Sequence, residues 1–262
     1  MTKTINNDQI YANGNIIAGG NIQSGDTMIE KNIENMSTIF NTNNYYMGLS
    51  PQQYNQLIEE ILSEVKKLLE KRKKEDIIIP ERDVFIPAMQ VLSNKFERED
   101  IKKMFINLLT NSMDKKTKGK VHPSYIDTLK NMDSLDAALF KKIIVKGEKY
   151  IKTINPNIGI KGTNSVFTNA LPEWYVDINV TDYDMYQISK SLVNLNRLGL
   201  IELMYDRTAG TDGYNTLEEK NDLNDILRKY QEYHKDKDLE LKVTKSVINV
   251  TEYGRELAEI CL

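Results

Sequence analysis

Apolar residues at helical spacing are the feature that most constrains how this chain can fold. Eight of them, between Tyr54 and Leu69, lie on one stripe of a helix that follows the sequence Ser50-Pro51-Gln52-Gln53. Ser50 can act as the N-cap, proline suits the first helical turn, and Gln53 can hydrogen-bond back to Ser50 as in a capping box. The sequence therefore predicts a long amphipathic helix from residue 50.

The helical pattern continues to about residue 152. We expect a short helix that starts at Pro87 and further helices in EREDIKKMFINLLTNSMD (97–114), VHPSYIDTLKNM (121–132) and SLDAALFKKIIVKGEKYI (134–151). Ser134 is the expected N-cap of the last of these. Residues 50–152 thus predict a helical domain.

The C-terminal part mixes helix and strand signals. Residues 155–180 form a polar, loop-rich stretch, and the helix expected from residue 182 is stopped by Gly199. A strand is expected at residues 200–205, an alternating strand in ELKVTKSVINV (240–250), and a final helix after Gly254. Together these elements predict a winged helix-turn-helix-like domain at residues 153–262, with a charged helical insertion at about 215–238. The predicted fold class is mainly α.

The first 49 residues form a separate segment that is rich in glycine and asparagine. Ile10, Ile16 and Ile22 recur every six residues, a period that excludes helical amphipathy. The dipeptides Asn13-Gly14 and Gly19-Gly20 favour turns and leave four-residue extended pieces, NIIA and NIQS, between turns. The segment is therefore prone to form short strands.

Three outcomes remain open for this segment. It can be a flexible tail, a short hairpin that adds to another sheet, or a site where identical strands from several subunits stack in register. The stretch GNIIAGGNIQSGD also resembles, loosely, the amyloid-like signalling segments at the ends of microbial immune proteins. The candidate oligomerisation residues are Asn15, Ile16, Gly19, Gly20, Asn21, Ile22 and Gly25.

From about residue 57 to its end, the chain resembles the Abi-alpha family of bacterial proteins associated with abortive infection. The matching pieces are IIIPERDVFIP, EDIKKMFINLLTNSMD, VHPSYIDTLKNMDSLDAALFKKI, SLVNLNRLGLIELMY and VTEYGRELAEIC. The resemblance implies a cytosolic, helical protein with a winged-helix-like end that acts in defence against phage. It implies no catalytic mechanism, and the first 49 residues lie outside it.

Charge disfavours nucleic acid as the partner. The formal net charge is −3, and from residue 133 onward the chain carries 21 acidic and 17 basic side chains. That balance opposes binding to phosphate backbones, so protein interaction is the preferred use of the C-terminal domain. If a nucleic acid or a protein partner does bind there, the candidate contacts are Lys190, Asn194, Arg197, Lys242 and Lys245.

The sequence contains no catalytic motif that is specific. His122 lies near Ser124 and Asp127, but His-Pro-Ser followed by an acidic residue is more typical of the start of a helix. One cysteine and two histidines predict no internal disulfide and no structural zinc, and we expect no cofactor. The sequence also contains neither an apolar run long enough to span a membrane nor a recognisable signal peptide.

These observations lead to one leading hypothesis and one alternative. The first is a cytoplasmic anti-phage protein, not an enzyme, that acts by binding a phage or host protein and by forming a homo-oligomer. The alternative is a winged-helix regulator that binds nucleic acid.

Overall fold

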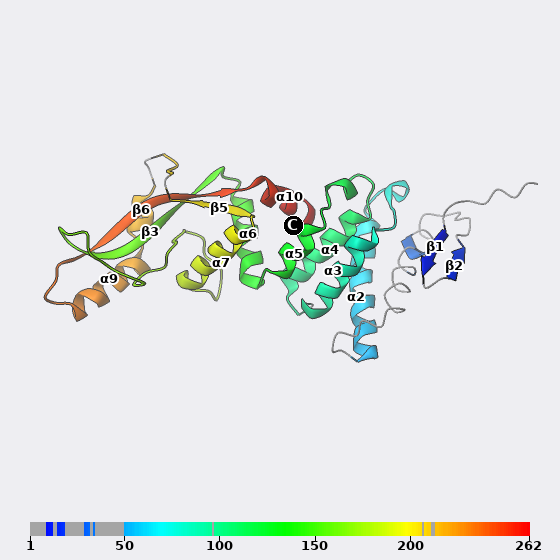
Figure 1. The fold of residues 1–262 in the computed structure, drawn as a ribbon, viewed down its shortest axis with the longest axis horizontal. Helices are drawn as coiled ribbons and strands as arrows, with labels where there is room; N and C mark the ends of the chain where they lie inside the picture. Colours follow the sequence, from blue (N-terminus) through cyan, green and yellow to red (C-terminus); the bar gives the residue numbers. More distant parts are fainter. Residues whose placement is uncertain are drawn as a thin grey trace, which may run out of the picture. The chain divides into compact units, whose positions relative to one another are not determined.

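A computed structural model describes residues 9–12, 15–18, 29–31, 34, 50–95, 97–205, 207–210 and 213–262 (Figure 1). The chain divides into two compact units. Unit 1 comprises Met1–Glu97 and Phe105–Ile126, and unit 2 comprises Arg98–Met104 and Asp127–Leu262.

Helices dominate the described part of unit 1. The first long helix, α2 (Pro51–Leu69), begins as predicted: the Gln53 backbone amide donates to Ser50 Oγ at 3.3 Å, and the Ser50 amide donates to Gln53 Oε1 at 3.0 Å. Its apolar stripe is buried from Tyr54 to Leu69. The other helical elements that belong wholly or partly to this unit are η1 (Lys74–Asp76), α3 (Arg82–Lys95), α4 (Glu99–Ser112), η2 (Lys118–Lys120) and α5 (Ser124–Lys130).

The prediction that a helix starts at Pro87 was wrong. Helix α3 begins at Arg82, and Pro87 lies inside it. A proline within a helix removes one backbone hydrogen bond. Burial of Val84, Phe85 and Ala88 on both sides of the proline keeps this segment helical.

A hairpin is described near the N-terminus of the chain. Strands β1 (Gln9–Ala12) and β2 (Asn15–Ala18) pair antiparallel, with Ala12 opposite Asn15 and Gln9 opposite Ala18. Strand β2 is the expected extended piece NIIA. The second expected piece, at residues 21–24, lies outside the described residues.

Unit 2 is built around two long antiparallel strands. Strands β3 (Tyr150–Ile160) and β6 (Leu239–Val250) pair along the whole of β3, from Tyr150 opposite Asn249 to Ile160 opposite Leu239 (Figure 1). The short strands β4 (Val166–Phe167) and β5 (Ile201–Met204) flank them and give the sheet order β4-β3-β6-β5. The helices of this unit are α6 (Ser134–Lys146), α7 (Met185–Arg197), α8 (Asn215–Glu218), α9 (Asn221–Tyr233) and α10 (Glu252–Cys261).

This sheet corrects the predicted fold class. The chain is a mixed α/β protein, neither mainly α nor winged-helix-like, because the main partner of β6 is the eleven-residue strand β3 and not β5. Asn155, Pro156 and Gly159 are turn residues, which is why the sequence pattern favours a loop in this region. In the structure the Asn155 side chain bridges from Ser246 Oγ on β6 to the Glu173 backbone carbonyl, and Gly159 leaves room for the Lys242 side chain. Partners distant in sequence thus hold these residues in a strand.

The charged insertion covers one face of the β3–β6 ribbon. Helix α9 packs against β6, and its side chains Ile226, Leu227 and Tyr230 border an apolar cluster. That cluster contains Ile154, Ile158, Ala170, Leu171, Tyr175, Tyr214, Leu217, Leu223 and Leu239. The helix predicted within residues 215–238 is therefore present, and it is amphipathic rather than merely solvated.

Two further helix boundaries differ from those expected. The N-cap of α6 is Asp133, whose carboxylate accepts from the Asp136 backbone amide at 2.9 Å, and not Ser134. Helix α10 starts at Glu252, capped by Thr251, and not after Gly254. Gly199, in contrast, ends α7 as predicted, with a φ of 73° that favours glycine.

Gly254 is a glycine for a steric reason. It lies inside α10, where a Cβ atom would overlap the backbone carbonyl of Leu200. That carbonyl also accepts a hydrogen bond from the Thr251 backbone amide at 3.2 Å, so it cannot move away without breaking the junction between β5 and α10. Close backbone approach therefore outweighs the poor helix propensity of glycine.

Replacing Gly254 by alanine should lower the free energy of unfolding of unit 2 by about 2–3 kcal/mol, because the methyl group must displace backbone. Urea unfolding followed by circular dichroism measures this change. Gly119→Ala is the matched control, since a Cβ there meets no atom within 4 Å, and it should be nearly neutral. Equal stability of the two variants would contradict the steric explanation.

Candidate functional site

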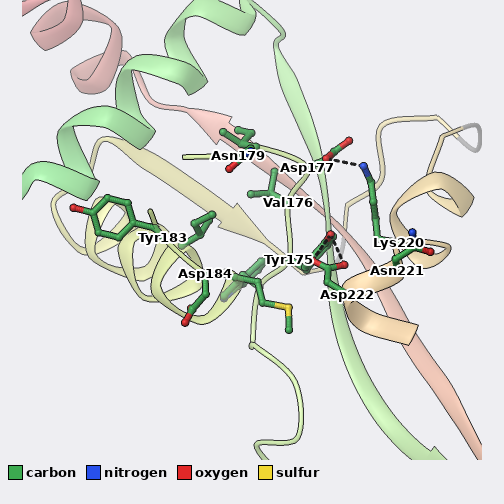
Figure 2. Close-up of a pocket in the computed structure, with 13 residues that line it drawn as sticks. Tyr175, Val176, Asp177, Asn179, Tyr183, Asp184, Lys220, Asn221 and Asp222 are labelled. Atoms are coloured by element: carbon green, nitrogen blue, oxygen red, sulfur yellow. Dashed lines mark hydrogen bonds and ion pairs between the residues drawn. The ribbon is translucent and has the colours of Figure 1, made fainter. Parts of the chain in front are cut away.

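The described part of unit 2 contains a pocket of about 590 Å³ (Figure 2). Three segments form it: the loop that follows β4, the first turns of α7, and the start of α9. Its lining residues are Trp174, Tyr175, Val176, Asp177, Ile178, Asn179, Tyr183, Asp184, Met185, Ile188, Lys220, Asn221 and Asp222. A volume of this size matches that of a small-molecule site or of a few side chains of a partner protein.

Two polar links cross the pocket wall (Figure 2). The Tyr175 hydroxyl donates to both carboxylate oxygens of Asp222, at 3.0 and 3.1 Å, and Lys220 Nζ lies 2.8 Å from Asp177 Oδ1. Burial raises the pKa of Tyr175 far above its ordinary value, and the Asp222 charge raises it further. Tyr175 therefore stays a hydrogen-bond donor and ties the start of α9 to the loop after β4.

The inner wall of the pocket is apolar and aromatic. Trp174 is buried, its ring lies 4.3 Å from that of Tyr205, and its backbone amide donates to Ser189 Oγ at 3.0 Å. The Tyr205 hydroxyl in turn donates to the Glu173 carboxylate, and burial with this bond raises the pKa of Tyr205 to about 12. The wall is thus held rigidly against α7.

The chemistry of the pocket favours binding over proton transfer. Asp184 caps α7 and accepts from the backbone amides of Tyr186 and Gln187 at 2.8 Å each, while Asp177 and Asp222 have the partners given above. Within the described ranges, no group of three or more His, Cys, Asp or Glu side chains is arranged to hold a metal ion. Three carboxylates beside one lysine give the pocket an acidic character, which suits a basic or neutral group with an apolar body.

The predicted contact residues Asn194 and Arg197 belong to a second polar cluster, which joins α6 to α7. Its centre is Asp136, which is 3% exposed and accepts from Ser191 Oγ at 2.6 Å, from Asn194 Nδ2 at 2.7 Å and from the Asp133 amide at 3.0 Å. Arg197 donates to Asn194 Oδ1 at 2.7 and 3.0 Å. Burial raises the pKa of Asp136 even though these bonds oppose the change. Asn194 therefore joins α7 to α6, and Arg197 holds the Asn194 side chain from within α7.

The other predicted contacts lie apart from one another. Lys190 is exposed on α7. Lys242 on β6 donates to the Thr163 backbone carbonyl, and Lys245 Nζ lies 5.4 Å from the centre of the Tyr214 ring. Because residues 242 and 245 differ by an odd number along β6, their side chains leave opposite faces of the strand. The structure does not assemble these lysines into one site.

Of the predicted oligomerisation residues, Asn15 and Ile16 lie in β2. Gly19, Gly20, Asn21, Ile22 and Gly25 lie outside the described residues.

Of the three residues of the histidine candidate, His122 and Ser124 meet at the start of α5, and Asp127 lies in the first turn of that helix. His122 Nδ1 lies 2.7 Å from Ser124 Oγ and accepts from the Ser124 backbone amide at 3.1 Å. The second bond satisfies an amide of the first helical turn, as a capping side chain does. Both contacts are local, in keeping with a role in starting the helix.

The pocket and the role of Asp136 could not be predicted from the motifs of the sequence. The pocket residues come from segments up to 48 positions apart, and the local signal available in that stretch was its tryptophan, Trp174. The Asp136 cluster had a local signal, the Asp133-x-x-Asp136 spacing of an acidic capping box, which we assigned to the wrong N-cap.

Comparison with known proteins gives one match. The family model described as Abortive infection alpha matches residues 53–261. No curated protein and no solved structure matches the chain. Among the helices of the described ranges, none combines the length and the apolar character needed to cross a membrane.

Removing the Asp136 carboxylate should lower the free energy of unfolding by about 3 kcal/mol, because Asp136→Ala takes the acceptor from the buried Ser191 hydroxyl and leaves the half-buried Asn194 amide with only the Asn131 carbonyl. Urea unfolding measures the change. Asp127→Ala, at an exposed position of α5, should change stability by less than about 0.5 kcal/mol. A loss below about 1 kcal/mol in Asp136→Ala would show that the cluster does not join the helices.

The raised pKa of Asp136 also predicts a pH dependence. Between the unfolded value of about 3.8 and the higher folded value, the native state binds the extra proton, so stability falls as pH rises through this range. The stability difference between wild type and Asp136→Asn should therefore shrink from pH 4 towards neutral pH and then stay constant. Asp127→Asn serves as control, and a difference for Asp136→Asn that stays constant over the whole range would contradict the assignment.

Proposed function

Since the chain belongs to the abortive infection alpha family, we propose that it acts in bacterial defence against phage, through protein–protein interaction and self-assembly rather than catalysis. The family match, residues 53–261, reaches into both units, so the role in defence attaches to the folded part of the chain. The part that the N-terminal segment plays in self-assembly is our own proposal. Infection would change the assembly or the partner of the protein.

The hairpin β1–β2 is the observation that supports self-assembly. Within the described residues its sheet has only two strands, so each strand is paired on one side. The outer edge of such a strand offers backbone amides and carbonyls to another chain, and a two-stranded hairpin is marginally stable by itself. Edge-to-edge pairing between copies would supply the missing strands.

The acidic pocket of unit 2 is the proposed site for a protein partner. Its apolar wall around Trp174 and its rim of Asp177, Asp184 and Asp222 suit a segment that carries a basic or apolar side chain. Val193 on α7, which is 42% exposed, adds apolar surface to the same helix that lines the pocket. The partner would be a phage or a host protein.

The side chains that are chemically capable of catalysis have structural roles in this fold. His122 and Ser124 start α5, and Asp136 joins α6 to α7. We also propose that the protein acts in the cytoplasm, because its single cysteine, Cys261, is a buried free thiol in keeping with a reducing compartment.

A charge placed in β2 should block assembly. We expect Ile16→Lys, and likewise deletion of residues 1–48, to lower the mass in solution to that of a smaller species, because a lysine in an edge strand opposes strand pairing. Light scattering coupled to size-exclusion chromatography measures the mass. Plaque counts on cells that express each variant test whether protection is lost with assembly.

Asn215→Lys is the matched control, since it adds the same charge at an exposed position of α8. It should retain both the mass and the protection of the wild type. A mass for Ile16→Lys equal to that of the wild type would refute self-assembly through the hairpin. If a variant that no longer assembles still protected the cells, self-assembly would not be needed for defence.

A further inference from the structure

Two lysine-rich segments that are about forty positions apart in sequence meet on the surface of unit 1. The segment 71–76 (KRKKED) follows α2, and the segment 114–120 (DKKTKGK) follows α4. Together they carry eight basic and three acidic residues, a net charge of +5 in a chain whose net charge is −3. We call these two segments the basic surface.

Backbone and side-chain bonds fix the two segments against each other. The Ile78 amide donates to the Met113 carbonyl and the Lys115 amide to the Asp76 carbonyl, both at 2.9 Å. Lys115 Nζ also donates to the Glu75 carbonyl at 2.7 Å. The segments therefore form one structured surface rather than two separate charged loops.

Two of the three acidic residues on the basic surface are directly paired. Arg72 Nη1 lies 3.3 Å from Asp114 Oδ2, and Asp114 is 2% exposed. Lys116 Nζ lies 2.5 Å from Asp76 Oδ2, and its hydrogen bond lowers the pKa of Asp76, so that both groups are charged at neutral pH. Within each of these two ion pairs the positive and the negative charge cancel. Lys71, Lys73, Lys74, Lys115 and Lys120 are exposed, and so is Lys118, whose Nζ lies 3.4 Å from Glu81 Oε1.

We propose that the basic surface binds the phosphate backbone of double-stranded nucleic acid without sequence preference. This proposal is independent of the proposed function. Seven of its eight cations are lysines, which act as point charges toward phosphate, and a duplex offers the densest regular array of phosphates. The segments contain no aromatic residue on which an unpaired base could stack, so a duplex fits better than a single strand.

The composition of the surface also argues against an anionic membrane as its partner. Stable membrane binding needs a buried apolar anchor beside the positive charge. The two segments contain no large apolar residue, and of the apolar residues that border them Ile77 and Met113 are buried and Val121 is half-buried. The surface therefore has the positive charge needed to contact phosphate groups but lacks the apolar anchor needed to bind a membrane stably.

The test measures binding of the full chain to a random-sequence 20-base-pair duplex by fluorescence anisotropy between about 0.05 and 0.2 M salt. We expect a slope of log affinity against log salt of about −4, which corresponds to roughly four phosphate contacts. In the double variant Lys71→Gln/Lys73→Gln, the slope should become shallower by about 2. Since each of the two lost contacts costs roughly a factor of eight at 0.1 M salt, affinity should fall about 60-fold.

The matched control is Lys229→Gln/Lys235→Gln, which makes the same charge change at exposed positions of unit 2. Its affinity for the duplex should lie within about twofold of that of the wild type, because salt screens charges that are distant from the binding surface. An equal loss in both double variants would overturn the proposal, since net charge and not this surface would then drive binding. Absence of binding at 0.05 M salt would also overturn it, as would binding to phosphatidylserine vesicles with no binding to the duplex.

Discussion

Strands β3 and β6 pair along the whole length of β3, and the rest of unit 2 depends on this pairing. A two-stranded ribbon buries too little apolar surface to be stable alone, so both its edges and its faces need partners. Strands β4 and β5 extend the edges, and α9 with the loop around Tyr175 covers one face. The insertion between β5 and β6, which contains α8 and α9, therefore contributes buried residues to the core of unit 2. The pocket arises from this arrangement, because its walls are the loop and the helix ends that the ribbon brings together.

Features decided by neighbouring residues could be predicted from the sequence. The capping box of Ser50 and Gln53, the end of α7 at Gly199 and the helical conformation of α9 all depend on contacts within a few positions. Features decided by distant residues could not. Asn155 is held in β3 by Ser246, 91 positions away, and Gly254 is required by the carbonyl of Leu200. Turn propensity gave the wrong answer at both places because a tertiary contact outweighed it.

The motifs that carry the family resemblance have structural roles in this chain. Asp114, in the stretch SMD, is buried against Arg72, and Asp136, in the stretch LDAAL, connects α6 to α7. Both carboxylates accept from donors within the fold, so each stabilises the packing around it. The basic surface shows the complementary effect: a net charge summed over 262 residues conceals a local excess of opposite sign.

The position of Trp174 gives the two units separate optical signatures. It is the only tryptophan of the chain, it is 2% exposed, and it belongs to unit 2. Indole emission therefore reports the environment of unit 2 alone, whereas the far-ultraviolet signal of the helices has contributions from both units. Superimposable melting curves from the two signals would mean that the units unfold as a single cooperative body, and separated curves would resolve the order in which they unfold.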